Sequence, residues 1–402
     1  MIETQNEQAP GQGNTLESEL KPSAKHTVLE VRVVTGTGGG PDKTILNSPR
    51  FLRQYGYETI CAYMRPPNDA GFDVLRQRAK QWDAPLIEID DRGPLDYRVF
   101  RSLLQICREN NVTIWHGHDY KSNAIGVILR RFWPMKLVTT VHGWVRRTMR
   151  TPLYYAVDRL SLRFFDKVVC VSEDLVEKSV QAGVPRSKCV LIENAIDTEY
   201  FQRTMSREES RKKLGVEPSR LLIGAMGRLS AEKGFDRLIQ AASRLIADGM
   251  DFQLVIAGEG AEHDKLAELI RESGHTDRIR LLGFCQDTLL FHQALDIFAL
   301  SSLREGLPNV VLESMAVANP VVATQIAGLP RLIQTGSEGI LVPPDDVDAL
   351  YQSLKELIAS PETRQSMGAC ARSTVEQRFS FARRMELFRN LFDEMLAVQT
   401  TA

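Results

Sequence analysis

"DIFALSSLREGLPNVVLESMAVANPVVAT", residues 296–324, places a strand, a turn, a helix and a second strand in one short segment. Its apolar start suits a buried strand, and Arg304 to Leu307 suit the turn. Pro308 is the predicted first helical residue, because the start of a helix does not need the N–H that proline lacks. We expect the helix to run from about Asn309 to Ala318, with Asn319 in the left-handed conformation that ends it.

Short apolar, β-branched runs of this kind recur along the chain in two series. The first series comprises 28–34, 58–64, 85–89, 112–118, 137–142 and 167–172. The second series comprises 221–226, 252–258, 279–284, 296–302, 320–324 and 339–342. Segments with helical periodicity separate the runs, which is typical of βαβ units and a parallel sheet. We therefore predict an α/β fold of two Rossmann-like, doubly wound parallel-sheet domains that face each other across a cleft.

The length of 402 residues exceeds what one hydrophobic core usually organises. The polar start predicts a disordered tail at 1–25 and lacks the layout of a signal peptide. We place an N-terminal domain at 26–197 and a C-terminal domain at 198–372. A final helical run at 373–398 could cross back to the first domain.

Composition excludes several classes of function. The formal net charge of -1 gives no overall attraction for nucleic acid, so we predict no nucleic-acid partner. No apolar run approaches the ~18 residues that a membrane span needs. The six cysteines show no short paired spacing, and we expect them to be reduced. These features predict a cytoplasmic protein that is soluble or peripheral to a membrane.

Two carboxylates flank the start of the helix at 309–318. Glu305 precedes the helix, whose free N–H groups and positive dipole end should face the cleft, and Glu313 lies one turn inside it. An anion could be held there, with carboxylates beside it. The alternative is a salt-bridged helix start with no chemical role.

Two cations follow the first strand of the second domain, in "MGRLSAEKG" (226–234). Arg228 and Lys233 lie in the loop that opens the next helix. Two cations and helix N–H groups can stabilise a departing diphosphate without a metal ion. The alternative is a pair of solvated surface cations.

A glycine-rich loop, "TGTGGGPDK" (35–43), follows the first strand and raises the possibility of a nicotinamide dehydrogenase. Pro41 occupies the place of the last glycine of the dinucleotide-binding pattern. Glu58 lies at the start of the second strand, whereas the ribose-binding acid belongs at its end. Backbone N–H groups of the loop could instead approach a phosphate or an acceptor, or the loop could be a plain structural turn.

Histidines end two strands of the first domain, in "HGHDYKSN" (116–123) and "TVHGW" (140–144). His116 and His118 alternate to one face and Asp119 adjoins them, which could suggest a metal. No further ligand is evident, so we predict no metal site. For His142 the alternative to an active-site role is a polar loop histidine.

Basic and aromatic residues concentrate in "ILRRFWPMK" (128–136) and "WVRRTMR" (144–150). Such a cluster suits an anionic membrane surface, although charge runs are usually solvated faces. The cluster consists of Arg130, Arg131, Phe132, Trp133, Lys136, Trp144, Arg146, Arg147 and Arg150.

The Glu–x7–Glu pattern within "EGLPNVVLE" resembles the retaining two-Rossmann-domain (GT-B) glycosyltransferases of family 4. The resemblance implies that Glu305 contacts the donor sugar, that Glu313 binds the ribose hydroxyls, and that Arg228 and Lys233 hold the diphosphate. The implied catalytic residues are Glu305, His142, Arg228 and Lys233. The implied donor-binding residues are Gly38, Gly39, Gly40, Gly227, Arg228, Lys233, Phe284, Cys285, Glu305, Gly306, Leu307, Pro308, Asn309 and Glu313. The implied acceptor-side residues are His116, His118, Asp119 and His142.

The same resemblance implies an N-terminal acceptor domain and a C-terminal donor domain. It implies transfer from a nucleotide diphosphate sugar, expected to be a UDP-sugar, to a hydroxyl of a glycan or lipid-linked glycan in cell-surface polysaccharide or lipopolysaccharide synthesis. No cofactor is expected, and the enzyme could lie on the inner face of the membrane. Two positions depart from the family: Ala195 stands where Gly is usual, and Arg331 stands where Glu is frequent.

Two alternatives from other classes remain at this point. One is a catalytically silent subunit that binds a nucleotide sugar, although the presence of Arg228, Lys233, Glu305 and Glu313 argues against loss of activity. The other is the NAD-dependent dehydrogenase.

Overall fold

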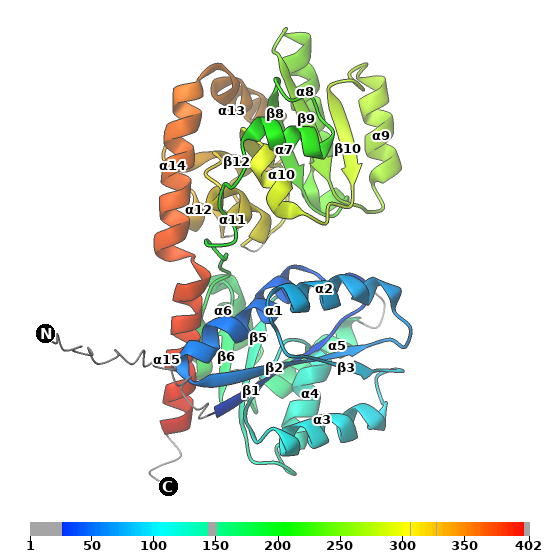
Figure 1. Cartoon of the computed structure of the whole chain (residues 1–402), viewed down its shortest axis with the longest axis vertical. Helices are drawn as coiled ribbons and strands as arrows, with labels where there is room; N and C mark the ends of the chain where they lie inside the picture. Colours follow the sequence, from blue (N-terminus) through cyan, green and yellow to red (C-terminus); the bar gives the residue numbers. More distant parts are fainter. Residues whose placement is uncertain (1–25, 144–150, 306, 327, 398–402) are drawn as a thin grey trace, which may run out of the picture.

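The structure, a computed structural model, describes residues 26–143, 151–305, 307–326 and 328–397 (Figure 1). The predicted tail, Gly306 and the basic residues Arg146, Arg147 and Arg150 lie outside the described residues, as does Trp144.

Within the described residues, the first domain contains a seven-stranded parallel sheet in the order β3-β2-β1-β4-β5-β6-β7. The strands are β1 (His26–Val33), β2 (Tyr57–Arg65), β3 (Leu86–Asp90), β4 (Val112–Gly117), β5 (Lys136–Val141), β6 (Lys167–Cys170) and β7 (Cys189–Leu191). The helices are α1 (Gly40–Leu52), α2 (Asp73–Gln81), α3 (Tyr97–Glu109), α4 (Tyr120–Leu129), α5 (Thr151–Leu162) and α6 (Glu173–Gln181).

The second domain contains a six-stranded parallel sheet in the order β10-β9-β8-β11-β12-β13 among the described residues. The strands are β8 (Leu221–Met226), β9 (Phe252–Ala257), β10 (Ile279–Gly283), β11 (Ile297–Leu300), β12 (Val321–Thr324) and β13 (Gly339–Val342). The helices are α7 (Arg207–Leu214), α8 (Phe235–Ala247), α9 (His263–Glu272), α10 (Thr288–Ala294), α11 (Asn309–Ala316), α12 (Leu329–Leu332), α13 (Val347–Ala359) and α14 (Pro361–Arg378).

Both sheets confirm the predicted doubly wound fold, because in each the strand order reverses beside the first strand. The reversal falls between β1 and β4 in one sheet and between β8 and β11 in the other. Ligands of open parallel sheets bind beyond the carboxyl ends of the strands at such a reversal. The glycine-rich loop follows β1, and the loops that carry Arg228 and Glu305 follow β8 and β11. The topology therefore brings these three loops toward one cleft.

The last helices tie the two domains together. α14 lies along the second domain and α15 (Phe381–Ala397) along the first, so the predicted run at 373–398 is divided between two helices (Figure 1). At the crossing, Ile196 N donates to Phe379 O at 2.9 Å and Phe381 N donates to Ile196 O at 2.7 Å. Both crossings of the chain between the domains therefore meet at one hinge.

The apolar face of α15 explains why it returns to the first domain. Phe388 and Phe392 are buried with Val28, Ile114 and Val138 of the first sheet. Burial of aromatic side chains of this size contributes about 1.5–3 kcal/mol each. The first sheet is thus covered by α15 and α1 on one face and by α3 and α4 on the other.

Local expectations for the segment 296–324 need three corrections. Pro308 is the N-cap rather than the first helical residue, and the helix ends at Ala316. The left-handed residue is Ala318, at φ 61°, instead of Asn319. Asn319 is buried because its amide is used elsewhere: Nδ2 donates to His292 O at 2.8 Å, and Oδ1 accepts from Arg203 at 3.0 Å. The Asn319 side chain therefore holds the turn after α11 in place through its hydrogen bonds to His292 and Arg203.

The sequence runs predicted twelve of the strands and missed β7, a three-residue strand whose side chains are only half-buried. All six cysteines lie in described residues and carry free thiols. No helix of the described chain combines the length and apolarity needed to cross a membrane.

Candidate active site

A cleft of about 430 Å³ lies between the domains, beyond the carboxyl ends of β1 and β8. It brings together most of the predicted donor-binding residues. The first domain contributes Gly38, Gly39 and Gly40, and the second contributes Gly227, Arg228, Phe284, Cys285, Asn309 and Glu313. Lys43 and Arg78, which the sequence analysis did not single out, also line the cleft.

Glycines make the close approach of two loops possible at the floor of the cleft. Gly258 has φ 144°, and a Cβ on it would lie 1.8 Å from Gly227 O. Gly38 has φ 73°, a left-handed conformation that favours glycine. The backbone of both loops therefore lies at the surface of the cleft, where N–H groups can reach a ligand.

Glu305 forms an ion pair with Lys233 across two loops of the second domain. Lys233 Nζ contacts Glu305 Oε1, which also accepts a hydrogen bond from Ser302 Oγ at 2.8 Å. Neither residue lines the measured cleft, but a Cβ on Gly227 would lie 3.3 Å from Lys233 Cε. The two side chains are 15% and 13% exposed, so the pair lies at the edge of the cleft, within reach of solvent.

Glu313 is fully buried, and both of its oxygens have neighbours. Lys43 Nζ of the first domain lies 2.5 Å from Oε1, and His292 Nε2 lies 3.3 Å from Oε2. Burial alone would raise the pKa of Glu313, but the charge of Lys43 and the hydrogen bond of His292 lower it to about 2. Glu313 is therefore a carboxylate at neutral pH. Its ion pair joins two domains, which a salt bridge within a helix start would not do.

Arg228 and Asn309 complete the second-domain wall. Arg228 is half-exposed and donates to Glu232 Oε1 at 2.8 Å, a surface pair that a ligand can replace at little cost. Asn309 Nδ2 donates to Gly40 O at 3.3 Å across the cleft. Leu307 is buried in the core and Pro308 caps α11, so these two position the loop rather than line the cleft.

The predicted acceptor-side histidines form a separate cluster beneath α1. His116, His118 and His142 line a small hollow with Glu30, which the sequence analysis did not include. Asp119 instead caps α4, where it accepts from Lys121 N and Ser122 N, and it also accepts from Val33 N at 2.7 Å. The carboxylate oxygens of Asp119 thus accept hydrogen bonds from backbone N–H groups. Only the position of Glu30 on β1, beside β4, could have indicated its contact with the histidines.

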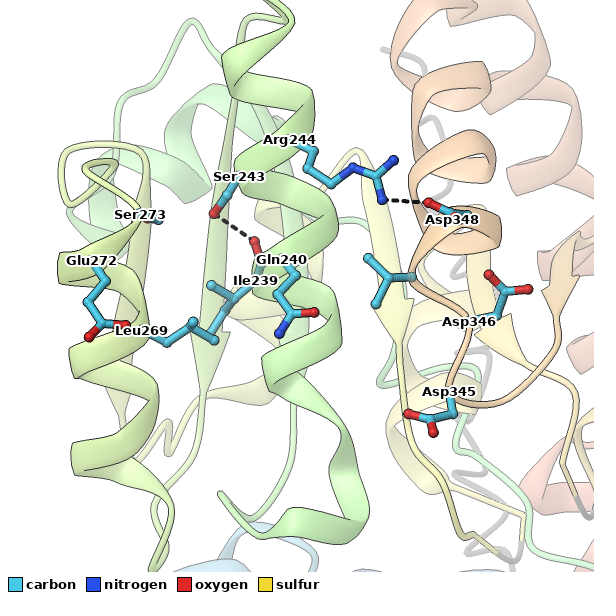
Figure 2. A pocket seen from close by; sticks show the side chains of 11 residues that line it. Ile239, Gln240, Ser243, Arg244, Leu269, Glu272, Ser273, Asp345, Asp346 and Asp348 are labelled. Atoms are coloured by element: carbon cyan, nitrogen blue, oxygen red, sulfur yellow. Dashed lines mark hydrogen bonds and ion pairs between the residues drawn. The ribbon is translucent and has the colours of Figure 1, made fainter.

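A larger hollow lies away from this cleft. About 850 Å³ in volume, it is a groove between α8, α9 and the loop before α13, where Arg244 Nη1 lies 2.6 Å from Asp348 Oδ1 (Figure 2). Its walls are helix surfaces with carboxylates at the rim, and none of the described residues that line it is a glycine. Volume therefore favours the groove, whereas the convergence of charged groups from two domains favours the cleft, and we assign the candidate site to the cleft.

Two family models match the chain. Residues 38–200 match the model described as Glycosyltransferase Family 4, and residues 206–374 match the model described as Glycosyl transferases group 1. Together they cover most of both domains, including the cleft residues named above.

Individual proteins are similar along most of the chain. A lipopolysaccharide core biosynthesis mannosyltransferase, LpcC, from Rhizobium leguminosarum bv. viciae is 26% identical over 76% of this chain and 85% of its own. A D-inositol 3-phosphate glycosyltransferase from Corynebacterium aurimucosum is 24% identical over 91% of this chain and 93% of its own. The crystal structure of Anabaena Alr3699/HepE in complex with UDP superposes with a TM-score of 0.76 at 20% identity, over 92% of this chain and 100% of that chain.

Proposed function

The chain belongs to glycosyltransferase family 4 and has the GT-B fold, and from this premise we propose that it transfers a sugar from a nucleotide diphosphate sugar to a hydroxyl with retention of the anomeric configuration. One observation supports the proposal most: glycine-rich backbone, cations and the carboxylate of Glu313 meet in one cleft between the domains. A nucleotide diphosphate offers hydroxyls to the carboxylate and phosphate oxygens to the cations.

In the proposed reaction, the bond between the anomeric carbon and the diphosphate oxygen breaks, and a bond to the acceptor oxygen forms on the same face. The acceptor proton passes to the departing diphosphate. Arg228 and Lys233 stabilise the negative charge that grows on the diphosphate, so their contacts strengthen in the transition state. Glu305 accepts hydrogen bonds from the transferred sugar in place of Lys233.

Lys43 is the group that a bound nucleotide would displace from Glu313. Because Lys43 and His292 engage the two oxygens of Glu313, ribose hydroxyls would compete with Lys43 for the carboxylate. The released ammonium would then face the phosphates from the first domain. Donor binding and domain contact would thus be linked through one side chain.

Uridine is the proposed donor base, because the Anabaena neighbour is described in complex with UDP. A glycan or lipid-linked glycan is the proposed acceptor, in cell-surface polysaccharide or lipopolysaccharide synthesis, because the Rhizobium relative is a lipopolysaccharide core mannosyltransferase. No cofactor is proposed. The enzyme would act in the cytoplasm, at the inner face of the membrane.

Calorimetric titration with UDP, GDP and ADP tests the donor assignment, and we expect UDP to bind at least about tenfold more tightly than the others. Incubation with UDP-sugars without an acceptor should give slow hydrolysis, and NMR of the released sugar should show retained configuration. A catalytically silent subunit would bind UDP and release no sugar. Failure of all three nucleotides to bind would contradict the proposal.

We further propose that the first domain contacts an anionic membrane through the outer faces of α4 and α5. Val157, Leu160 and Phe164 follow at helical spacing and are exposed by 40%, 56% and 57%. Ile128 and Phe132 are half-exposed on the neighbouring segment. Arg131, also exposed, lies at the same end of α4. Exposed apolar residues beside cations suit a lipid surface with negative headgroups.

Two predicted members of the basic cluster have structural partners instead. Arg130 lies 3.1 Å from Asp166, and Trp133 Nε1 donates to Val112 O at 2.7 Å. The sharper test therefore changes the exposed apolar residues. The double variant Leu160→Ser with Phe164→Ser should reduce sedimentation with vesicles of phosphatidylglycerol. Leu387→Ser, on α15 at the other face of the sheet, is the matched control and should sediment like the wild type. Equal sedimentation of all variants would contradict the proposal.

A further inference from the structure

A chain of contacts runs from a buried carboxylate to the predicted active-site histidine of the first domain. Glu30 Oε2 on β1 lies 2.5 Å from His118 Nε2, and His118 Nδ1 lies 3.1 Å from His142 Nε2. The rings of His118 and His142 are stacked, with centroids 5.4 Å apart. Glu30 and His118 are buried, whereas His142, at the carboxyl end of β5, is partly exposed.

The direction of each hydrogen bond follows from the charges around the chain. Arg384 of α15 already brings one positive charge near Glu30, with its guanidinium donating to Glu193 O, and Arg32 lies nearby, paired with Asp42 at 2.6 Å. A protonated imidazole would add a second positive charge to a buried site. Burial and the neighbouring His116 lower the pKa of His118 to about 3, and burial and His118 hold the pKa of His142 well below its usual range.

Glu30 remains a carboxylate. Burial alone would raise its pKa, but the neighbouring imidazoles of His116 and His118, which contact its carboxylate, lower it to about 2. A carboxylate can only accept, so His118 carries its proton on Nε2. A neutral His118 then has a bare Nδ1, which accepts from His142 Nε2. A neutral His142 is in turn bare at Nδ1, and among the described residues no hydrogen bond to that nitrogen is found.

We propose that Glu30 and His118 fix the tautomer of His142, so that its Nδ1 presents a hydrogen-bond acceptor to a substrate hydroxyl. Glu30 and His118 are positioning residues in this arrangement, and His142 is the residue that touches substrate. The part in turnover rests on the proposed glycosyltransferase function, whereas the tautomer is a property of the free protein. A charged His118 would donate from Nδ1 to His142 Nε2, so that His142 would carry its proton on Nδ1 and present a donor instead.

The same three groups, Glu30, His116 and His118, could also be read as a metal site, since their ligand atoms lie within 4.8 Å of one another. Tetrahedral zinc with bonds of about 2.0–2.1 Å would hold its ligand atoms roughly 3.3 Å apart. The separation of 2.5 Å between His118 Nε2 and Glu30 Oε2 is too short for that and suits a hydrogen bond to a carboxylate. The geometry thus favours the hydrogen-bond chain.

The wild-type protein allows a direct test of the tautomer. In protein labelled with ¹⁵N in its seven histidines, long-range ¹H–¹⁵N spectra distinguish protonated from bare ring nitrogens. Assigned by comparison with His142→Gln, the His142 ring should be neutral at pH 7, protonated at Nε2 and bare at Nδ1. A ring protonated at Nδ1, or at both nitrogens, would overturn the proposal.

Two ring-conserving variants separate positioning from packing. His118→Phe removes the link, so His142 should become a mixture of tautomers, and turnover should fall about tenfold or more with nucleotide affinity nearly unchanged. His116→Phe is the matched control: His116 Nδ1 lies 2.9 Å from the same Glu30 oxygen, but its other nitrogen contacts Thr140. The His142 signals should not change in that variant.

Two further results would overturn the proposal, and one would separate it from the proposed function. Equal changes of the His142 signals in both variants would overturn the proposal, as would one equivalent of zinc that survives dialysis and shifts the His118 signals. If the tautomer is as expected but no sugar is released from any donor, the proposed function fails and the hydrogen-bond chain stands.

Discussion

The two domains hold their carboxylates in different ways. On the second-domain side, Glu305 and Glu313 each contact a lysine from another loop or domain, Lys233 and Lys43. On the first-domain side, Glu30 is shared by two buried imidazoles. A lysine on a flexible stem can be exchanged for a ligand hydroxyl, whereas breaking a buried hydrogen-bond chain leaves an unpaired charge. The carboxylates of the second domain are therefore suited to exchange a lysine for a ligand hydroxyl. Glu30 of the first domain is suited to keep its hydrogen bonds to the two histidines.

The largest effect should come from Glu305→Gln, because a sugar contact that strengthens in the transition state raises turnover. We expect turnover to fall at least ~100-fold, corresponding to about 3 kcal/mol, with nucleotide affinity nearly unchanged. Single-turnover assays and calorimetry measure the two quantities. Melting temperatures must first match the wild type, since Lys233 loses its partner. Near-normal turnover would mean that the ion pair is structural only.

Glu313→Ala should lower nucleotide affinity rather than turnover, the reverse of Glu305→Gln. Ribose hydroxyls lose a charged acceptor worth roughly 1.5–3 kcal/mol, so nucleotide affinity should weaken about 10- to 100-fold. Turnover at saturating donor should change much less, because the contact is equal in the ground state and the transition state. Glu313→Gln, which keeps the volume of the side chain, is the matched variant and should show the same direction. A loss confined to turnover would exchange the roles of the two carboxylates.

The sequence predicted the site residues of the second domain better than those of the first, for a physical reason. The residues from Glu305 to Glu313 lie within one strand-turn-helix unit, so their spacing alone predicts their proximity. Lys43 meets Glu313 only because two domains close on each other, a contact 270 positions apart. Glu30 meets His118 only through the pairing of β1 with β4. Contacts between neighbouring strands or domains leave no local pattern, and β7 was missed because its three residues are too few to show one.

Lys43→Met should make nucleotide binding depend on pH, which tests the contact between the two sides. In the wild type the pKa of Glu313 is about 2, so this carboxylate should add no pH dependence to the affinity from pH 8 to pH 5. Without the charge of Lys43, burial raises the pKa of Glu313, and affinity should fall by up to about tenfold for each pH unit below it. Lys43→Arg keeps the charge and should remain flat.

Stability provides a second measurement for the same variant. The folded-state pKa of Glu313 lies below its ordinary value of 4.5, so the group stabilises the wild type above about pH 4.5, and this contribution is lost as the pH falls toward 2. Thermal melts of Lys43→Met should lack that contribution. Identical pH profiles of affinity for Lys43→Met and Lys43→Arg would show that Lys43 does not control the charge of Glu313.

The smallest effect should come from a chelator, for which we expect turnover to change less than about twofold. On the second-domain side, Arg228 and Lys233 supply the positive charge that a departing diphosphate needs, and both are held by single carboxylates that the substrate can replace. On the first-domain side, Glu30, His116 and His118 are spaced for hydrogen bonds rather than for a metal. Turnover measured in EDTA, then with added magnesium or manganese, checks both sides at once. Loss of most activity, restored by either ion, would mean that the two cations do not suffice for the diphosphate. Restoration by zinc alone, with the histidine signals shifted, would place the requirement in the histidine cluster instead.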